Sequence, residues 1–124
     1  MLIVKTIVKP STIHGLGLFA EQVIPKGTKT WILNPLVDIT YTKEQIETFS
    51  EEFRNYLSMY AYEIEDGKRV LCGDGARHMN HSDNPNIDSI PPYEDMTNRD
   101  ILPGEELTIN YYLFDKESVR LGTI

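Results

Sequence analysis

A polar stretch of ten residues, 77–86, places the strongest constraint on how this chain can fold. It holds an arginine, two histidines, three asparagines and a proline, a composition too polar for a buried strand and too rich in hydrogen-bonding side chains for an ordinary turn. Asn84, Pro85 and Asn86 alone would be typical of a loop, because asparagine caps its own turns and the residue before proline avoids the helical region. The whole stretch indicates a loop that binds something.

A metal site built from His78, His81 and Asp83 is one interpretation of this stretch, since imidazole and carboxylate groups are metal ligands. Cys72 is the only cysteine, and no spaced ligand partner occurs elsewhere. An internal disulfide or a cysteine zinc cluster is therefore excluded. We expect no metal, and a single cysteine fits an intracellular, reducing compartment.

Length and hydropathy predict one intracellular domain. The 124 residues, 40% hydrophobic and 25% charged, are typical of a globular protein with one modest core. No segment approaches the roughly 18 apolar residues of a membrane span, and the N-terminus lacks the layout of a signal peptide. We expect a cytoplasmic or nuclear protein that does not bind membranes.

The charge balance favours a basic partner. The chain has 12 basic and 19 acidic residues, a net charge of −7. Proteins that bind a phosphate backbone present basic surfaces, so direct binding to nucleic acid is not expected. An acidic surface favours encounter with a basic protein or peptide; the alternative is that acidity only aids solubility.

Turn residues divide the chain into short strands, which predicts a mainly β fold. Trp31, the only tryptophan, is expected to pack in the core or on a sheet face. The Asp66-Gly67 dipeptide predicts a hairpin over residues 59–72. Residues 87–96, which contain Pro91 and Pro92, are expected to form an irregular loop or a bulged edge. The strand candidates are residues 2–8, 18–20, 28–33, 36–40 and 107–112.

One helix is expected, over residues 42–56. Thr42 and Gln45 match a capping box, and apolar residues recur at helical spacing from Ile46 to Leu57. The acidic residues between them are expected to face solvent. A role for this segment in reading a peptide stays open.

Gly15 and Gly17 form a Gly-x-Gly turn that is more often a β-turn or bulge than a binding loop. The third glycine of the dinucleotide fingerprint and the Gly-Lys-Ser/Thr ending of phosphate loops are absent. Glu105 and Glu106 resemble a catalytic pair only superficially, because neighbouring residues of a strand face opposite ways.

Three blocks in order nevertheless carry a resemblance: IHGLGLFA at 13–20, RHMNHSDNPN at 77–86 and RDILPGEELTINY at 99–111. Together they resemble the SET domain of protein lysine methyltransferases over nearly the whole chain. The resemblance implies a single SET domain over residues 1–124, without zinc-binding flanking domains. It also implies several small sheets, a knot-like C-terminal crossing, one inserted helix, and S-adenosylmethionine as cofactor.

The resemblance also assigns residues. Tyr111 matches the catalytic tyrosine and Tyr60 the second tyrosine of the site, with Tyr56 and Tyr62 as alternatives to Tyr60. His81 could be a base, but main-chain contacts and an internal structural bond are favoured. The cofactor contacts are His14, Leu16, Gly17, Arg77, Asn80, His81 and Tyr111. The substrate channel comprises Tyr60, Tyr62, Ile109, Tyr112 and Phe114.

The function implied is transfer of a methyl group to the lysine ε-amine of a basic protein or peptide, such as a histone tail. The alternative is a catalytically degenerate SET domain that binds a peptide or protein; retention of Tyr111, Asn80 and His81 favours the enzyme. Ile109 stands where the family often has an aromatic residue, so the number of methyl groups stays open. Without a C-terminal zinc cluster, the channel is expected to be completed either by Tyr112 and Phe114 or by a second copy of the chain in a homodimer.

Overall fold

Short strands build most of the molecule. The computed structural model describes residues 1–90 and 93–121. The strands are β1 (Thr6–Pro10), β2 (Leu16–Ala20), β3 (Lys29–Ile32), β4 (Ile39–Tyr41), β5 (Tyr62–Glu63), β6 (Arg69–Leu71), β7 (Asn80–His81), β8 (Ile87–Ile90), β9 (Glu94–Thr97) and β10 (Glu106–Ile109). The helices are α1 (Lys43–Glu47), α2 (Glu51–Tyr60) and α3 (Lys116–Leu121), with 3₁₀ turns η1 (Glu65–Gly67), η2 (Gly75–His78) and η3 (Tyr111–Leu113).

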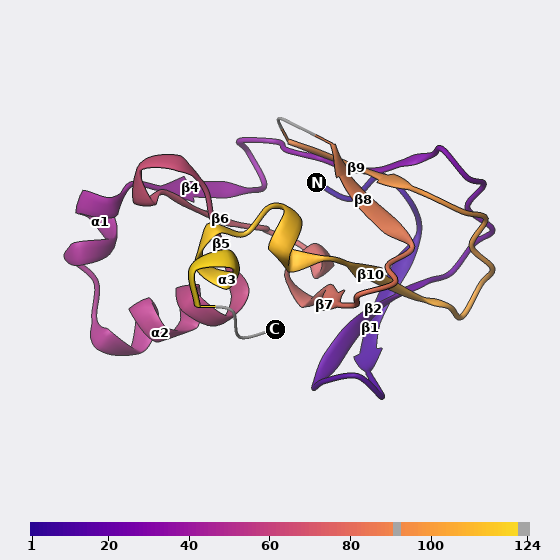
Figure 1. Ribbon diagram of the computed structural model, residues 1–124, viewed down its shortest axis with the longest axis horizontal. Coiled ribbons are helices and arrows are strands. Elements are labelled where there is room, and N and C mark those ends of the chain that lie inside the picture. Colours follow the sequence, from indigo (N-terminus) through magenta and orange to yellow (C-terminus); the bar gives the residue numbers. More distant parts are fainter. Residues whose placement is uncertain (91–92, 122–124) are drawn as a thin grey trace.

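The strands pair in three small sheets, with the orders β1-β2-β10-β7, β3-β9-β8 and β4-β6-β5. Figure 1 shows α1 and α2 with β4 at one end of the molecule and β1, β2 and β10 at the other, while α3 and β5 lie between them. The expectation of a mainly β fold made of several small sheets is confirmed.

The polar stretch 77–86 holds β10 in place. β10 is antiparallel to β2 and parallel to β7. Beyond β7, the Ser82 N–H donates to the Ile109 carbonyl at 3.0 Å. The Asn86 side chain accepts from the Thr108 N–H and donates to the Glu106 carbonyl, both at 2.9 Å. The last strand therefore crosses against this stretch, as the expected C-terminal crossing requires.

The main core lies under the first sheet. Leu18, Ile24, Ile87, Ile101 and Leu107 are fully buried in one cluster. Burying such a side chain contributes about 1.5–3 kcal/mol. Since these residues come from both halves of the chain, the core fixes how the halves meet.

The single helix expected over residues 42–56 is wrong, because the segment forms two helices. Thr42 and Gln45 make the predicted capping box of α1. Ser50 then caps α2, its side chain accepting from the Phe53 N–H at 3.2 Å. Serine favours a cap over a helix interior, so the chain restarts there and α2 continues to Tyr60. A second apolar cluster around buried Leu57 attaches α2 to β6.

Of the irregular loop or bulged edge expected over residues 87–96, the loop is wrong. The bulged edge is confirmed in part, since β8 is an edge strand and the pairing of β9 with β3 shifts register between Lys29 and Trp31. β8 and β9 form an antiparallel pair in register from Ile87 opposite Thr97 to Ile90 opposite Glu94. β9 pairs with β3 on its other side. The two prolines between the strands, residues 91 and 92, lie outside the described residues.

The hairpin expected over residues 59–72 is confirmed from Tyr62 to Leu71, the part that contains β5, the turn and β6. β5 and β6 pair antiparallel, and Asp66 and Gly67 take positive φ, 60° and 71°, as a type I′ turn requires. Tyr60, however, ends α2 and belongs to no strand. The expected last strand over 107–112 ends at Ile109, and α3 follows in a tail for which no helix was predicted.

Candidate active site

Tyr111 lies where β10 ends and the chain turns into η3. The Asn110 side chain accepts from the Tyr112 N–H at 3.0 Å and so starts this turn. The Tyr111 hydroxyl donates to the Met79 carbonyl, and its backbone N–H donates to Nδ1 of His81 at 3.1 Å. Two separate bonds thus fix the tyrosine against the segment 79–81.

The environment of Tyr111 keeps its hydroxyl protonated. Burial raises its pKa to about 12, and the nearby charges of Asp115 and Glu106 act in the same direction. At neutral pH the side chain is therefore a neutral phenol, which can hold an amine by a hydrogen bond but is not a strong base.

Tyr111 faces a cavity of about 380 Å³. The cavity lies among the end of α2, β5, η2, β9 and the segment from β10 to α3. Its wall includes most of the residues assigned to the channel: Tyr60, Tyr62, Ile109 and Phe114, together with Arg77 and Tyr111. Tyr112 does not line it, and its ring contacts His81 at 5.6 Å.

Tyr60 and Tyr62 reach the cavity from different elements. The expectation that the hairpin over residues 59–72 would carry both on one strand, with their side chains on the same face, is therefore wrong. Tyr60 ends α2, with its ring 5.4 Å from the His78 ring. Tyr62 is in β5, with its ring 5.1 Å from that of Phe114. Burial raises the pKa of Tyr62. Both rings still contribute to one aromatic wall.

Tyr56, the alternative to Tyr60, does not line the cavity but lies directly behind it. Its hydroxyl accepts from Nη1 of Arg77, and its ring is 4.7 Å from that of Tyr60. Nε of Arg77 donates to the Cys72 carbonyl at 3.0 Å. Tyr56 therefore orients both Arg77 and Tyr60.

The glycine turn meets Asn80. The Asn80 amide nitrogen lies 3.1 Å from the carbonyls of both His14 and Leu16, and 2.8 Å from Oε2 of Glu106. A Cβ on Gly17 would lie 2.5 Å from the same carboxylate oxygen. Gly17 is thus required by close packing against Glu106, and Asn80 fixes the turn through its carbonyls.

Glu105 and Glu106 take separate partners, as expected for neighbouring residues. Glu106 accepts from Oγ of Ser11 at 2.7 Å as well as from Asn80. Glu105 accepts from the Leu102 N–H in the preceding turn. Both carboxylates hold turns and strands, and they do not converge on one point.

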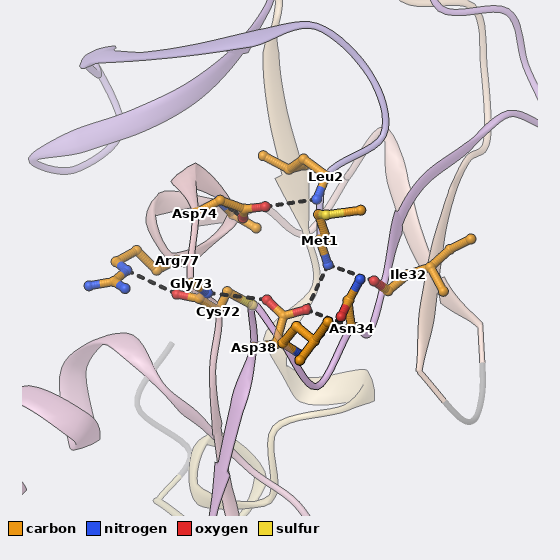
Figure 2. Close-up of polar contacts among 11 residues, drawn as sticks. Met1, Leu2, Ile32, Asn34, Asp38, Cys72, Gly73, Asp74 and Arg77 are labelled. Atoms are coloured by element: carbon orange, nitrogen blue, oxygen red, sulfur yellow. Dashed lines mark hydrogen bonds and ion pairs between the residues drawn. The ribbon is translucent and has the colours of Figure 1, made fainter.

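A buried carboxylate anchors the segment before the site (Figure 2). The Asp38 side chain is fully buried and lies 2.6 Å from the Met1 ammonium group. It also accepts from the Asn34 N–H at 2.9 Å and the Gly73 N–H at 3.1 Å. Asp38 therefore ties the N-terminal segment to the chain just before η2.

Asp74 makes a second link between the N-terminal segment and η2. One oxygen accepts from the Leu2 N–H at 2.8 Å, and the other caps η2 at the Ala76 N–H at 3.1 Å. Figure 2 shows Arg77 emerging from this turn on the side away from Leu2. The position of Arg77 in the cavity wall depends on these contacts.

The groups around the glycine turn fit S-adenosylmethionine, the cofactor that the sequence resemblance implies. Carbonyl oxygens have two lone pairs, so those of His14 and Leu16 can each accept from an ammonium group while bonded to Asn80. Arg77 uses two of its five N–H donors in the bonds above, which leaves donors for a carboxylate. A Cβ on Gly15 would have no neighbour within 4 Å, so this turn leaves open space.

The structure separates the assigned cofactor residues into two groups. Arg77 and Tyr111 line the cavity, whereas His14, Leu16, Gly17, Asn80 and His81 do not. In the second group, Asn80 contacts the carbonyls of His14 and Leu16. Tyr111 joins the two through its bonds to Met79 and His81.

Metal ligation finds no support in the described ranges. No group of three or more His, Cys, Asp and Glu residues there could hold an ion. His78 packs on Tyr60, and Nε2 of His81 lies 2.9 Å from Asp83. None of the helices seen in residues 1–90 and 93–121 is long and apolar enough to cross a membrane.

Sequence reasoning missed several parts of the cavity. Met79 acts through its backbone carbonyl, which no side-chain motif reveals. Trp31, Ser89 and Asp95 also line the cavity. Ser89 and Asp95 were missed because the strands β8 and β9 were not recognised, whereas Trp31, in a predicted strand, was expected only to pack.

The fold and site define a small β-rich domain in which a tyrosine, placed after the last strand, joins an aromatic cavity to an asparagine–histidine pair and a glycine turn. The family model of the SET domain matches residues 15–112. The chain therefore belongs to the SET-domain family, whose members are generally S-adenosylmethionine-dependent lysine methyltransferases.

Solved structures share this fold. A candidate histone methyltransferase of Plasmodium falciparum superposes with a TM-score of 0.63 at 24% identity, over 87% of this chain and 93% of that one. A chain of Chaetomium thermophilum Polycomb Repressive Complex 2 bound to GSK126 gives 0.69 at 22% identity, over 96% of this chain and 17% of that one. A humanized mutant of that complex gives 0.68 at 20% identity, over 94% and 16%. No match is found among curated proteins.

Proposed function

We propose that this chain transfers a methyl group from S-adenosylmethionine to the ε-amine of a lysine in a basic protein. The observation that carries the proposal is the Tyr111 hydroxyl, which is bonded to the Met79 carbonyl in the wall of an aromatic cavity. The same tyrosine is bonded to His81, next to the asparagine that holds the glycine turn. A lysine side chain entering the cavity would reach the Tyr111 hydroxyl.

The cavity must help the lysine lose its proton. Lysine has a pKa near 10.4, so deprotonation at pH 7 costs about 5 kcal/mol at roughly 1.36 kcal/mol per unit. Burial lowers the pKa of an amine, and the rings of Tyr60, Tyr62 and Phe114 form an apolar wall. Placement in the cavity therefore offsets part of this cost without a strong base.

Tyr111 would orient the amine. Since its proton is directed to the Met79 carbonyl, the lone pairs of its oxygen are available to accept from the amine. A fixed acceptor limits the directions in which the nitrogen lone pair can point, which is the positioning that a displacement requires. S-adenosylmethionine, when bound, supplies the electrophilic methyl group.

The cofactor is proposed to lie against the glycine turn. His14, Leu16 and Gly17 would contribute main chain, while Asn80 and His81 hold that main chain in place. Arg77 would pair with the carboxylate of the cofactor, and Tyr111 would separate it from the lysine. The bonds of Asn80 to His14 and Leu16 support this assignment.

A basic substrate follows from charge. The net charge of −7 favours encounter with a lysine- and arginine-rich segment, and histone tails have this chemistry. A histone substrate would place the chain in the nucleus or the cytoplasm. Phe114, from the segment after β10, lines the cavity, and we propose that residues 1–124 act as one domain without a flanking zinc cluster.

The test is to incubate the purified chain with S-adenosylmethionine and a panel of basic proteins, histones included, and to measure added mass on lysines by mass spectrometry. We expect a methylated lysine with the wild type and none with Tyr111→Phe. Calorimetry with the cofactor provides a second readout. Cofactor binding without transfer to any lysine would favour a catalytically degenerate binding module. The absence of both cofactor binding and methyl transfer would refute the proposal.

A further inference from the structure

Three side chains form a row across one wall of the cavity. In the sheet β3-β9-β8, Asp95 on the central strand is opposite Trp31 on one side and Ser89 on the other. Residues directly opposite in neighbouring strands project to the same face of a sheet, and all three line the cavity. The proposed catalytic role of Tyr111 leaves this row without a function.

The side chain of Asp95 has no hydrogen-bond or ion-pair partner among residues 1–90 and 93–121. Its neighbour Glu94 is bonded to Lys29 at 2.8 Å. The two other carboxylates that line the cavity in the described ranges, those of Asp115 and Glu117, also have partners. Asp115 accepts from the backbone N–H of Glu63 and from the Ser118 hydroxyl. Glu117 accepts from the Arg69 guanidinium and from the Ser58 hydroxyl. Asp95 is thus the cavity carboxylate, within the described chain, that is left to bind a ligand.

A second polar group beside Asp95 also lacks a partner. Trp31 is 3% exposed, and its indole Nε1–H is buried without an acceptor in the described part of the molecule. A buried donor without an acceptor costs free energy. Because this N–H is buried and is itself a donor, it would not pair with a cationic ligand, so the acceptor that the row offers is Asp95.

Asp95 and Tyr111 occupy different parts of the cavity. Asp95 lies on β9, the central strand of the sheet β3-β9-β8, whereas Tyr111 lies in η3, beyond the end of β10 in the sheet β1-β2-β10-β7. A group bound at Asp95 would thus be a different one from the amine at Tyr111.

We propose that the row Trp31–Asp95–Ser89 binds a second cationic side chain of the substrate, an arginine or lysine close in sequence to the lysine that is methylated. This inference rests on the proposed function and adds a specificity-determining residue to it. A carboxylate forms its strongest hydrogen bonds with guanidinium and ammonium groups. The indole ring beside it attracts the same cations.

Electrostatics agree with a cationic ligand. Burial raises the pKa of Asp95 to about 7, and the Met1 ammonium group opposes the shift. The other ionisable neighbours that interact with Asp95 are Tyr62 and Cys72, whose pKa values are themselves raised by burial, so both are neutral near pH 7. A bound cation would stabilise the ionised carboxylate and lower its pKa.

The test uses a set of peptides that each contain one lysine in a neutral sequence. Arginine, lysine or glutamine is placed in turn at each position near the methylated lysine, and KM and kcat are measured for each peptide. For the wild type we expect one offset at which a basic residue lowers KM about tenfold relative to glutamine, the factor that one charge-assisted hydrogen bond supplies. With Asp95→Asn the arginine and glutamine peptides should become equivalent.

Asp88→Asn is the matched control. Asp88 is on β8 one residue before Ser89 and faces the other side of the sheet, so this variant removes the same charge but should keep the preference. The inference would be overturned if Asp95→Asn still preferred the basic peptide over the glutamine peptide, or if the wild type showed no such preference.

A binding measurement separates this inference from the proposed function. The carboxyl carbon of Asp95 is followed by NMR in ¹³C-aspartate-labelled protein, with and without the preferred arginine peptide or, if no peptide is methylated, with an arginine-rich peptide. We expect the peptide to lower the pKa of Asp95. Absence of methylation with every peptide would refute the proposed function, whereas an unchanged Asp95 pKa would refute this site.

Discussion

The backbone N–H of Tyr111 donates to Nδ1 of His81 at 3.1 Å, and this bond joins residues thirty apart in the sequence. Because Nδ1 accepts, the ring proton of the neutral histidine is on Nε2, which lies 2.9 Å from Asp83. Both ring nitrogens of His81 are therefore occupied. His81 is a positioning residue for Tyr111, and its bond agrees with the internal structural role favoured from the sequence.

Replacing His81 should test this positioning role. His81→Leu leaves the Tyr111 N–H without an acceptor, so we expect a loss of about 1–3 kcal/mol in the free energy of unfolding and a fall in kcat. His81→Asn offers an amide oxygen near the position of Nδ1 and should recover much of both. Urea unfolding and methyl-transfer kinetics provide the measurements, and equal behaviour of the two variants would contradict the role.

Removing the Tyr111 hydroxyl should stop transfer without unfolding the protein. Tyr111→Phe loses the bond to Met79 and the acceptor for the amine, and we expect kcat to fall about 10²–10³-fold, as when one positioned hydrogen-bonding group is removed from an active site. Cofactor affinity should change little. Tyr112→Phe is the control, since Tyr112 does not line the cavity. Turnover near the wild-type rate in Tyr111→Phe would show that the Tyr111 hydroxyl is not needed for methyl transfer.

Asn80 should matter to the cofactor through the glycine turn. Asn80→Ala frees the carbonyls of His14 and Leu16 and leaves Glu106 with Ser11 alone. We expect weaker binding of S-adenosylmethionine in calorimetry, by about tenfold for a loss of 1.4 kcal/mol. Glu106→Gln keeps an oxygen that can accept from Asn80 and should bind more tightly than Asn80→Ala. An unchanged affinity in Asn80→Ala would count against the assignment.

The sequence motifs located the parts of the site whose side chains act in fixed patterns. The Gly-x-Gly turn, Asn80, His81 and Tyr111 were found from spacing and resemblance, and the fold brings them together. The hairpin turn at Asp66 and Gly67 and the capping box at Thr42 were found because each depends on a few neighbouring residues.

The missed features depend on contacts between distant segments. Ser50 ends one helical pattern and begins another, which apolar spacing alone did not reveal. The strands β8 and β9 flank two prolines that suggested irregular chain, so the Asp95 row was not expected. Tyr60 was placed on a strand because it precedes one, whereas packing around Leu57 extends α2 to it.

Asp38 should be a determinant of stability outside the cavity. Asp38→Ala removes the partner of the Met1 ammonium group and the acceptor for the Asn34 and Gly73 N–H groups. Since Met1 is about half exposed, the main cost is the loss of a buried acceptor, about 1–3 kcal/mol. Asp38→Asn keeps an acceptor oxygen and should lose less. The urea midpoint of each variant gives the comparison, and a wild-type midpoint in Asp38→Ala would show that the network contributes no stability.

Asp95 should make folding stability depend on pH. Its pKa rises from 3.8 to about 7 on folding, so between these values the folded state holds a proton that the unfolded state has lost. Stability therefore falls as pH rises through this window, by up to about 1.4 kcal/mol per pH unit. Asp95→Asn removes the group, so its stability relative to wild type should be greater at pH 8 than at pH 4 when urea unfolding is measured at both. Asp88→Asn should show no such increase, and an equal difference at the two pH values would mean that Asp95 ionises normally in the cavity wall.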